Sequence, residues 1–397
     1  MTGEQSFFLS MLKGFASDSL APIPETLPDW DQLYALADDQ SMLGLCYRQL
    51  KAMAGEGLAI PAEALERFHR GFYSEIYFAA NRSAGMEELE GSFRKEGIDL
   101  VPFKGWVAKS YWPVPALRTM GDIDILIHTE DRQRTDSIMT ALGYERYVDN
   151  HAVWTYNARD LSFELHDHMF YEQLHNEVDY IGYFDRAWDY ASPELDESFH
   201  FVFLIAHLAK HTVNKGHGFR GYLDLVFFCR EAGARLRWDW IRESLDELKL
   251  FRFTETCMAL CREWFGFEPP FPVGELDESF FAFATEKLFQ DGIFGLENEQ
   301  NASSFAAREI SRARGPYILG ALGLTLRRIF PPYRDLQLIP WYSFVDGRPW
   351  LTPAAWVYRW YYCLVHKRSH SERLLTEPFA KRDVIEKRKQ QIRDWGL

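Results

Sequence analysis

The chain has 397 residues, of which 44 are Lys or Arg and 58 are Asp or Glu, so its formal net charge is −14. An apolar fraction of 47% and a charged fraction of 26% are ordinary for a folded protein, and they exclude disordered and fibrous classes. The acidic balance argues against general binding to nucleic acid, which needs cations collected on one face.

Composition also predicts a cytoplasmic protein without a transmembrane segment. The longest uncharged runs, 198–209 and 315–326, are shorter than the about 20 apolar residues that a membrane span needs. The first residues lack the basic region and long apolar stretch of a signal peptide. The five cysteines match neither a zinc pattern nor a disulfide pattern, so we expect buried thiols in a reducing compartment.

The first 96 residues are predicted to form an N-terminal helical region. Asp29 or Asp31 can cap a helix that continues to Leu50, and Pro61 suits the first turn of a second helix. Apolar residues recur at spacings of three and four along that second helix, which is typical of one buried stripe. Gly97 is well placed to end it.

Residues 97–170 have the character of a small mixed α+β domain. The segment Thr129–Leu142 is predicted to be helical, and it lies between the second and third of five strand-like runs. These runs, apolar or alternating in pattern, are Ile98–Val101, Ile123–His128, Glu145–Val148, Ala152–Tyr156 and Leu161–His166.

Helical patterns return over residues 171–397, with a possible joint at 266–274, where three prolines lie between two glycines. The predicted fold class is therefore α+β, with a small mixed β-sheet core flanked by N-terminal and C-terminal helical regions. An aromatic and basic stretch near the C-terminus could in principle meet a membrane surface or a base, but packing and lid roles are the expectation.

Three acidic residues are the predicted catalytic and metal-binding set. Asp122 and Asp124 alternate with buried isoleucines, so their side chains share one strand face. Glu164 and His166 share a face of a later strand in the same way. Three carboxylates could bind one or two Mg²⁺, or Mn²⁺, and support attack on the α-phosphorus of a nucleoside triphosphate, with Glu164 as activator of the acceptor.

A turn before the acidic strand is predicted to bind phosphate. Lys104 and Gly105 follow a strand and open a helix, where backbone amides can receive an anion and glycine permits close approach. Arg118 could bind the triphosphate or pair with Asp122 to hold its loop. Lys109 is expected on the surface.

These features together resemble the uncharacterised nucleotidyltransferase family of the DNA-polymerase-β-like superfamily. The resemblance is carried by Lys104-Gly105, an Arg-containing loop, the Gly-Asp-Ile-Asp-Ile-Leu run from Gly121, and the Glu-Leu-His from Glu164. The chain departs from the general superfamily pattern because Trp106, rather than Gly or Ser, follows Gly105.

The resemblance extends to flanking helices, where it implies a His-rich helix, an Arg/Asp segment and a late Leu-Arg-Arg stretch. The corresponding residues here are His207, Lys210, His211, Arg220 and Asp224, then 326–332. We predict that Lys210, His211 and His166 are nucleotide contacts, although the spacing of His207 and His211 taken alone favours hydrogen-bonded core or interface histidines. Asp224, four residues after Arg220, is most simply its intrahelical partner.

The leading expectation is a Mg²⁺-dependent nucleotidyltransferase that transfers a nucleoside monophosphate from a triphosphate such as ATP and releases pyrophosphate. The acceptor stays open: a small molecule, a protein side chain and an RNA 3′ end all fit, and the negative charge argues mildly against RNA. The alternatives are a nucleotide-binding protein without turnover on the same fold, and an interaction scaffold built on the helices.

Overall fold

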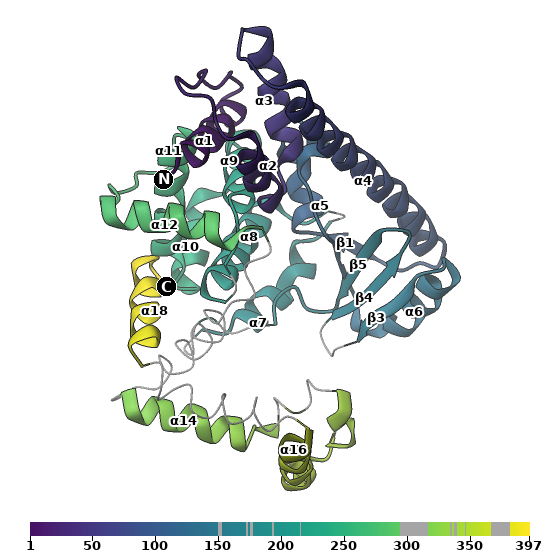
Figure 1. The fold of residues 1–397 in the computed structure, drawn as a ribbon. Coiled ribbons are helices and arrows are strands. Elements are labelled where there is room, and N and C mark those ends of the chain that lie inside the picture. The colour runs from purple at the N-terminus through teal and green to yellow at the C-terminus, as the bar shows by residue number, and fades with distance from the viewer. Residues whose placement is uncertain are drawn as a thin grey trace.

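The computed structural model describes the whole chain except residues 150–152, 172–173, 175–177, 193, 215, 294–316, 334–335, 337–339, 346 and 367–381. It confirms the predicted fold class, because a five-stranded mixed sheet lies beside a larger set of helices (Figure 1). No helix among these described residues has the length and apolar character needed to cross a membrane.

The N-terminal region is helical, as predicted, but its first predicted helix is two helices. Asp29 caps the first of them by accepting from the backbone N–H of Asp31 and Gln32. The chain then turns at Ser41, whose φ of 53° cannot continue a helix. The helices of this region are α1 (Gly3–Ala16), α2 (Trp30–Asp39), α3 (Leu43–Gly55) and α4 (Ala62–Lys95).

The turn between α2 and α3 is held by Gln40, which is completely buried. Its side-chain amide donates to the carbonyl oxygen of Leu288 and accepts from the backbone N–H of Phe219. Both partners lie far away in sequence, so the break in the predicted helix comes from tertiary hydrogen bonds.

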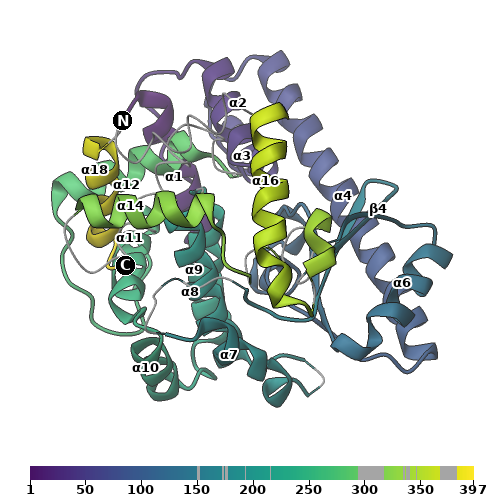
Figure 2. The ribbon, with the colours of Figure 1, turned by 90° about the horizontal axis from the view of Figure 1, so that it is seen from below.

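The long helix α4 connects the N-terminal helices to the sheet region. It runs along the outer edge in the view of Figure 1, and both ribbon views show α3 beside its first half and the sheet region beside its second (Figure 1 and Figure 2). Gly97, with a φ of 63°, follows its end, as predicted. Phe68 near one end and Phe93 near the other are fully buried, whereas none of residues 70–84 between them is fully buried.

The sheet has the strand order β1-β2-β5-β4-β3, and all neighbours are antiparallel except β2 and β5, which are parallel. The helix α6 (Arg132–Ala141) follows a short 3₁₀ turn at Thr129–Asp131, within the predicted helical segment. The strands agree with prediction to within two residues: β1 (Leu100–Pro102), β2 (Ile123–Ile127), β3 (Glu145–Asp149), β4 (Val153–Ala158) and β5 (Leu161–His166).

The two faces of the sheet have different neighbours. Ile123 and Ile125 lie in a hydrophobic cluster with α4 residues such as Met86. The opposite face, which carries the acidic side chains, packs toward the C-terminal helices through Phe103, whose ring contacts that of Phe203 at 5.3 Å between centroids. Alternation along each strand therefore separates a buried apolar face from a functional face.

Helices dominate the rest of the described chain. The segment 266–277 runs between two of them, and its Phe267 is buried in the core; the predicted domain boundaries stay predictions. The elements are α5 (Gly105–Ala108), α7 (Tyr180–Phe184), α8 (Glu197–Val213), α9 (Arg220–Ala232), α10 (Trp238–Glu247), α11 (Phe251–Phe265), α12 (Glu278–Asp291), α14 (Tyr317–Ile329), α16 (Thr352–His366) and α18 (Arg382–Asp394), with short 3₁₀ turns at Lys109–Tyr111, Pro115–Leu117, Asp185–Tyr190, Pro340–Val345 and Pro349–Leu351.

Candidate active site

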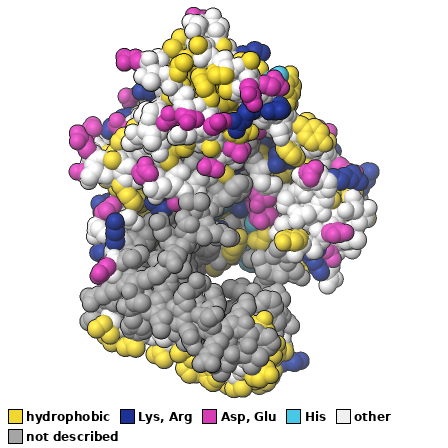
Figure 3. Space-filling model, viewed as in Figure 1, with side chains coloured by type: hydrophobic (Ala, Val, Ile, Leu, Met, Phe, Trp, Pro, Cys, Tyr) yellow, Lys and Arg dark blue, Asp and Glu magenta, His cyan; other side chains and the backbone are white. Residues whose placement is uncertain are grey.

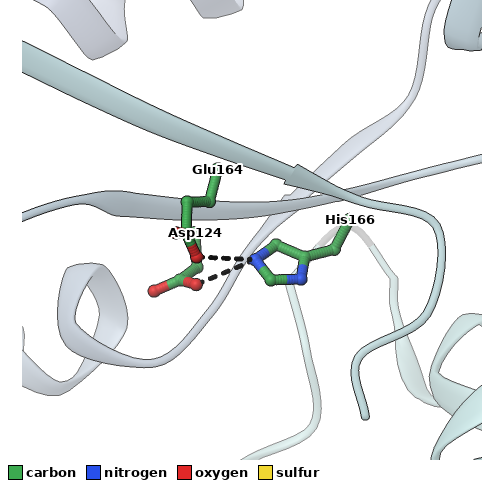
Figure 4. A group of neighbouring side chains, drawn as sticks. All are labelled: Asp124, Glu164 and His166. Carbon is green, nitrogen blue, oxygen red and sulfur yellow. Dashed lines mark hydrogen bonds and ion pairs between the residues drawn. The ribbon is translucent and has the colours of Figure 1, made fainter. Parts of the chain in front are cut away.

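The register of the parallel strands gathers the acidic side chains. In the pairing of β2 with β5, Asp124 lies opposite Glu164, and Leu126 lies opposite His166. Neighbouring strands are about 4.8 Å apart, so residues paired in this way share one patch of the sheet. One ligand atom each of Asp124, Glu164 and His166 lies within 4.8 Å of the other two (Figure 4).

His166 lies beneath the two carboxylates and is completely buried. Its Nε2 atom is 2.9 Å from Oδ1 of Asp124 and 3.5 Å from Oε2 of Glu164 (Figure 4). Because ionised carboxylates only accept hydrogen bonds, Nε2 carries a proton and donates it. The imidazole therefore faces the acids and donates to them.

Lys104 supplies a cation at this patch. Its Nζ atom is 2.5 Å from Oδ1 of Asp124, the oxygen that His166 also contacts. The backbone of Lys104 has φ 51° and ψ −126°, a conformation that costs a residue with a Cβ about 1–3 kcal/mol. Its N–H donates to Nε2 of His200 at 3.1 Å, which helps to hold the strained turn.

His200 is suited to that role because it is neutral. Burial lowers its pKa to about 4, so Nε2 has a free lone pair at physiological pH. Sequence reasoning missed this residue. The available signal was its spacing on α8, where His200, His207 and His211 follow one another at seven and four residues on one helical face.

The three acids have different protonation behaviour. Burial would raise the pKa of Asp124, but the adjacent Lys104 and His166 outweigh it and keep that pKa well below its usual value. Burial opposes, and His166 favours, the ionised form of Glu164, whose pKa is also lowered. Asp122 precedes β2 and has no such cation pair; burial, with the charges of Asp124 and Glu164, raises its pKa to about 6.

A pocket of about 510 Å³ opens above this patch, between the sheet and α8 and α9. The space-filling view shows acidic side chains at the edge of a hollow beside the sheet region (Figure 3). One wall of the pocket carries the carboxylates and Lys104, and the facing wall is basic. The basic and imidazole side chains of that wall are Arg118, His207, Lys210, His211, His217 and Arg220.

The histidines of α8 are both packed and exposed to this pocket. Nε2 of His207 and Nε2 of His211 are 3.2 Å apart, which makes one ring the donor and the other the acceptor. Burial and the cations around it, His211 first, keep the pKa of His207 well below its usual value. Lys210 extends over the ring of Tyr171 at 5.0 Å from its centroid. These side chains stand opposite the carboxylates.

Gly105 lines the pocket and also leaves room for a neighbouring side chain, and its predicted contact with phosphate stays a prediction. The helix that it opens, α5, is a single turn of four residues, too short for a developed helix dipole. A Cβ atom at this position would clash with the guanidinium of Arg118. The glycine therefore makes room for that arginine.

Arg118 pairs with Asp224, not with Asp122. Its Nε and Nη2 atoms donate to the two carboxylate oxygens at 3.1 and 2.6 Å, and the pair is buried. Trp112 donates from Nε1 to the same carboxylate at 2.8 Å. The predicted intrahelical pair of Asp224 with Arg220 is thus wrong. Asp224 instead forms the bidentate pair with Arg118, which is 106 positions away in the sequence, in preference to Arg220 on its own helix.

Arg220 is left with a neutral partner. It donates to the hydroxyl of Thr119 at 2.9 Å, and no carboxylate in the described part of the chain lies within 4.0 Å of it. Burial and the neighbouring Arg118 lower its pKa, but a guanidinium stays charged at neutral pH. It therefore presents positive charge to the pocket.

The donor set of the sheet patch fits a divalent cation. Carboxylate oxygens suit Mg²⁺ and Mn²⁺. Asp124 and Glu164 offer oxygens on adjacent strands, and Asp122 lines the same pocket. The geometry thus places acids that could bind a metal opposite cations that could bind phosphate.

Comparison with protein families gives a match over much of the chain. The family described as "Uncharacterised nucleotidyltransferase" matches residues 26–266, which span α2 to α11 and contain every pocket residue named above. No curated protein matches the chain, and no solved structure matches it either.

Proposed function

This chain belongs to the uncharacterised nucleotidyltransferase family, and from that premise we propose that it is an active, metal-dependent enzyme. It transfers a nucleoside monophosphate from a nucleoside triphosphate to an acceptor hydroxyl and releases pyrophosphate. The observation that carries the proposal is the pairing of Asp124 with Glu164 across parallel strands, opposite a basic wall.

In this proposal the acids bind the metal and move the proton. Asp122, Asp124 and Glu164 would hold Mg²⁺ or Mn²⁺, which when bound polarises the phosphate oxygens and offsets the charge of the leaving group. The acceptor oxygen forms a bond to the α-phosphorus, the bond from that phosphorus to the bridging oxygen breaks, and pyrophosphate leaves with the electron pair. Glu164 receives the hydroxyl proton.

The basic wall binds the triphosphate. Lys210, His211 and Arg220 line the pocket opposite the carboxylates, at a position where they can donate to β- and γ-phosphate oxygens. Arg118, whose Nη1 donates to the carbonyl oxygen of Thr119, also lines it. His166 holds Asp124 and Glu164 in place, which replaces the nucleotide contact first expected of it.

One observation favours the second candidate, a nucleotide-binding protein without turnover. The Lys104 ammonium and the His166 imidazole both occupy Oδ1 of Asp124, so a metal must compete with two cationic or donating groups for that oxygen. A protein that binds nucleotide through its basic wall alone would use this arrangement to keep the carboxylates neutralised.

The test is pyrophosphate release from each nucleoside triphosphate with Mg²⁺ or Mn²⁺ and a mixed pool of acceptors. We expect Asp124→Asn to lower kcat by about 10²–10³-fold, because a metal ligand is lost. The matched control is Asp99→Asn, an exposed aspartate beside β1, which should retain full activity. Tight nucleotide binding with no pyrophosphate release in any pool would establish the second candidate instead.

A further inference from the structure

A second pocket adjoins the catalytic one. It has a volume of about 770 Å³ and lies along the half-buried middle of α4, facing α2 and the 3₁₀ turn at Pro115–Leu117. Arg118 and Met120 line both pockets, so a single wall separates them. We call this second space the α4 pocket. Its size suits a small molecule.

Cations without acidic partners line the α4 pocket. Arg70, Arg82 and Lys109 all face it, and no carboxylate in the described part of the chain comes within 4.0 Å of any of them. Lys109 is half-buried, not at the surface as expected, and its Nζ atom lies over the ring of Trp106. Burial, followed by the charge of Arg82, lowers the pKa of Lys109 to about 8, and the charge of Glu90 acts against that shift.

The acids of the pocket do not offset this charge. Glu75 is the acid at its centre; burial raises its pKa to about 8, so it is mostly neutral at pH 7. Asp38, the other acid in the lining, is exposed. The pocket therefore has a net positive charge in a molecule whose overall charge is −14.

One of these cations, Arg82, interacts with a catalytic carboxylate. Burial lowers the pKa of Arg82, and the charge of Asp122, in the adjoining pocket, acts against that shift. A molecule bound at Arg82 and Lys109 would extend toward Asp122 and the position of the α-phosphate.

We propose that the α4 pocket binds the acceptor, and that the acceptor is a small hydroxylated anion with a carboxylate or phosphate group. Arg82 and Lys109 bind the anionic group, and the hydroxyl points past Arg118 toward Asp122. This inference rests on the proposed function and deepens it. It selects a small molecule among the three acceptor classes that the sequence leaves open.

The first experiment measures binding of inorganic phosphate to the full chain by calorimetry, without nucleotide or metal. We expect the double variant Arg82→Gln, Lys109→Gln to bind phosphate at least tenfold more weakly than wild type. Lys95→Gln, an exposed lysine on the same helix, is the matched control and should bind as wild type does. Since neither substituted cation has a carboxylate partner, the double variant leaves no buried acid unpaired and should unfold at the same temperature.

The second experiment separates this inference from the proposed function. Binding of ATP with Mn²⁺ should stay within twofold in the double variant, because the basic wall of the catalytic pocket is intact. Pyrophosphate release should rise with hydroxylated carboxylates or phosphate monoesters, and the two sets tell which anionic group is preferred. The proposal is overturned if neutral sugars raise it equally, or if the double variant binds phosphate as tightly as wild type. Loss of ATP binding in wild type would instead contradict the proposed function.

Discussion

Two adjoining pockets treat buried acids in opposite ways. In the catalytic pocket Asp124 is surrounded by Lys104 and His166, and these partners keep its pKa low in spite of burial. In the α4 pocket Glu75 accepts hydrogen bonds from the backbone of Gly44 and Leu43 but has no cation bonded to it among the described residues, and burial raises its pKa to about 8. The carboxyl group of Asp124 is therefore ionised in the catalytic pocket, whereas that of Glu75 is mostly neutral in the α4 pocket on the other side of Arg118.

The difference shows where each pocket keeps its positive charge. Lys104 forms an ion pair with an acid, whereas Arg82 and Lys109 have no described carboxylate within 4.0 Å. A site that must receive a cation holds its carboxylates ionised, and a site that must receive an anion leaves its cations unpaired. Three substitutions test this difference in charge between the pockets. They change the partner of Arg118 in the shared wall, the neutral Glu75, and the paired Lys104.

The largest effect is expected at the wall itself. Asp224→Asn keeps the acceptor for Trp112 but leaves the buried guanidinium of Arg118 without a counter-charge. Breaking one side of a buried pair costs about 3–5 kcal/mol, because the remaining charge is desolvated and uncompensated. Denaturant unfolding of the full chain measures this loss. Ligand binding in both pockets should also become weaker, because both share the wall that Arg118 forms.

The matched control makes the same acid-to-amide change at an exposed pair. Glu275 pairs with Arg262 at 3.1 Å, but its side chain is 90% exposed. Glu275→Gln should change the free energy of unfolding by less than about 0.5 kcal/mol. If both variants lose the same small amount, Asp224 does not hold the wall, and Arg118 is free to change partners.

Local pattern was sufficient to predict the strands and the acidic residues. Alternation placed Asp124 on one face of a strand and Glu164 with His166 on one face of another, and the strand bounds agree to within two residues. The pairing of Asp124 with Glu164 needed the strand order, which alternation does not contain. Periodicity reports which face a residue occupies, but not which element lies opposite.

What the sequence could not predict depends on contacts between distant segments. Arg118 pairs with Asp224 and Lys104 donates to His200 across about a hundred positions. Gln40 breaks a predicted helix through two equally remote partners. Such contacts decide how a given Arg, Lys or Gln is used, so the chemistry of the site was predictable by residue type but not by partner.

The neutral acid provides the next test. The folded state holds a proton on Glu75 up to a pH of about 8, whereas the unfolded chain releases it near the ordinary value of 4.5. The free energy of unfolding should therefore fall as pH rises through that window. Glu75→Gln should remove on the order of 2 kcal/mol of this decline between pH 5 and pH 8.

Denaturant unfolding at several pH values compares the two proteins. Glutamine has nearly the same volume and still accepts from the N–H of Gly44. Glu87→Gln, at an exposed position of α4, is the matched control and should leave the decline unchanged. Parallel curves for wild type and Glu75→Gln would mean that Glu75 is ionised, and that the α4 pocket is less positive than inferred.

The smallest expected effect concerns the paired lysine, and its sign is the informative part. A divalent cation must displace the Lys104 ammonium from Oδ1 of Asp124, or bind beside it against its charge. Lys104→Met removes this competition, so Mn²⁺ alone should bind about tenfold more tightly, which corresponds to about 1.4 kcal/mol.

Lys109→Met is the control, because Lys109 pairs with no carboxylate in the described structure, and it should change Mn²⁺ affinity by less than twofold. Electron paramagnetic resonance of free Mn²⁺ gives both affinities without nucleotide. Weaker Mn²⁺ binding in Lys104→Met would mean that the lysine orients Asp124 for the metal, and the two pockets would then differ in geometry more than in charge.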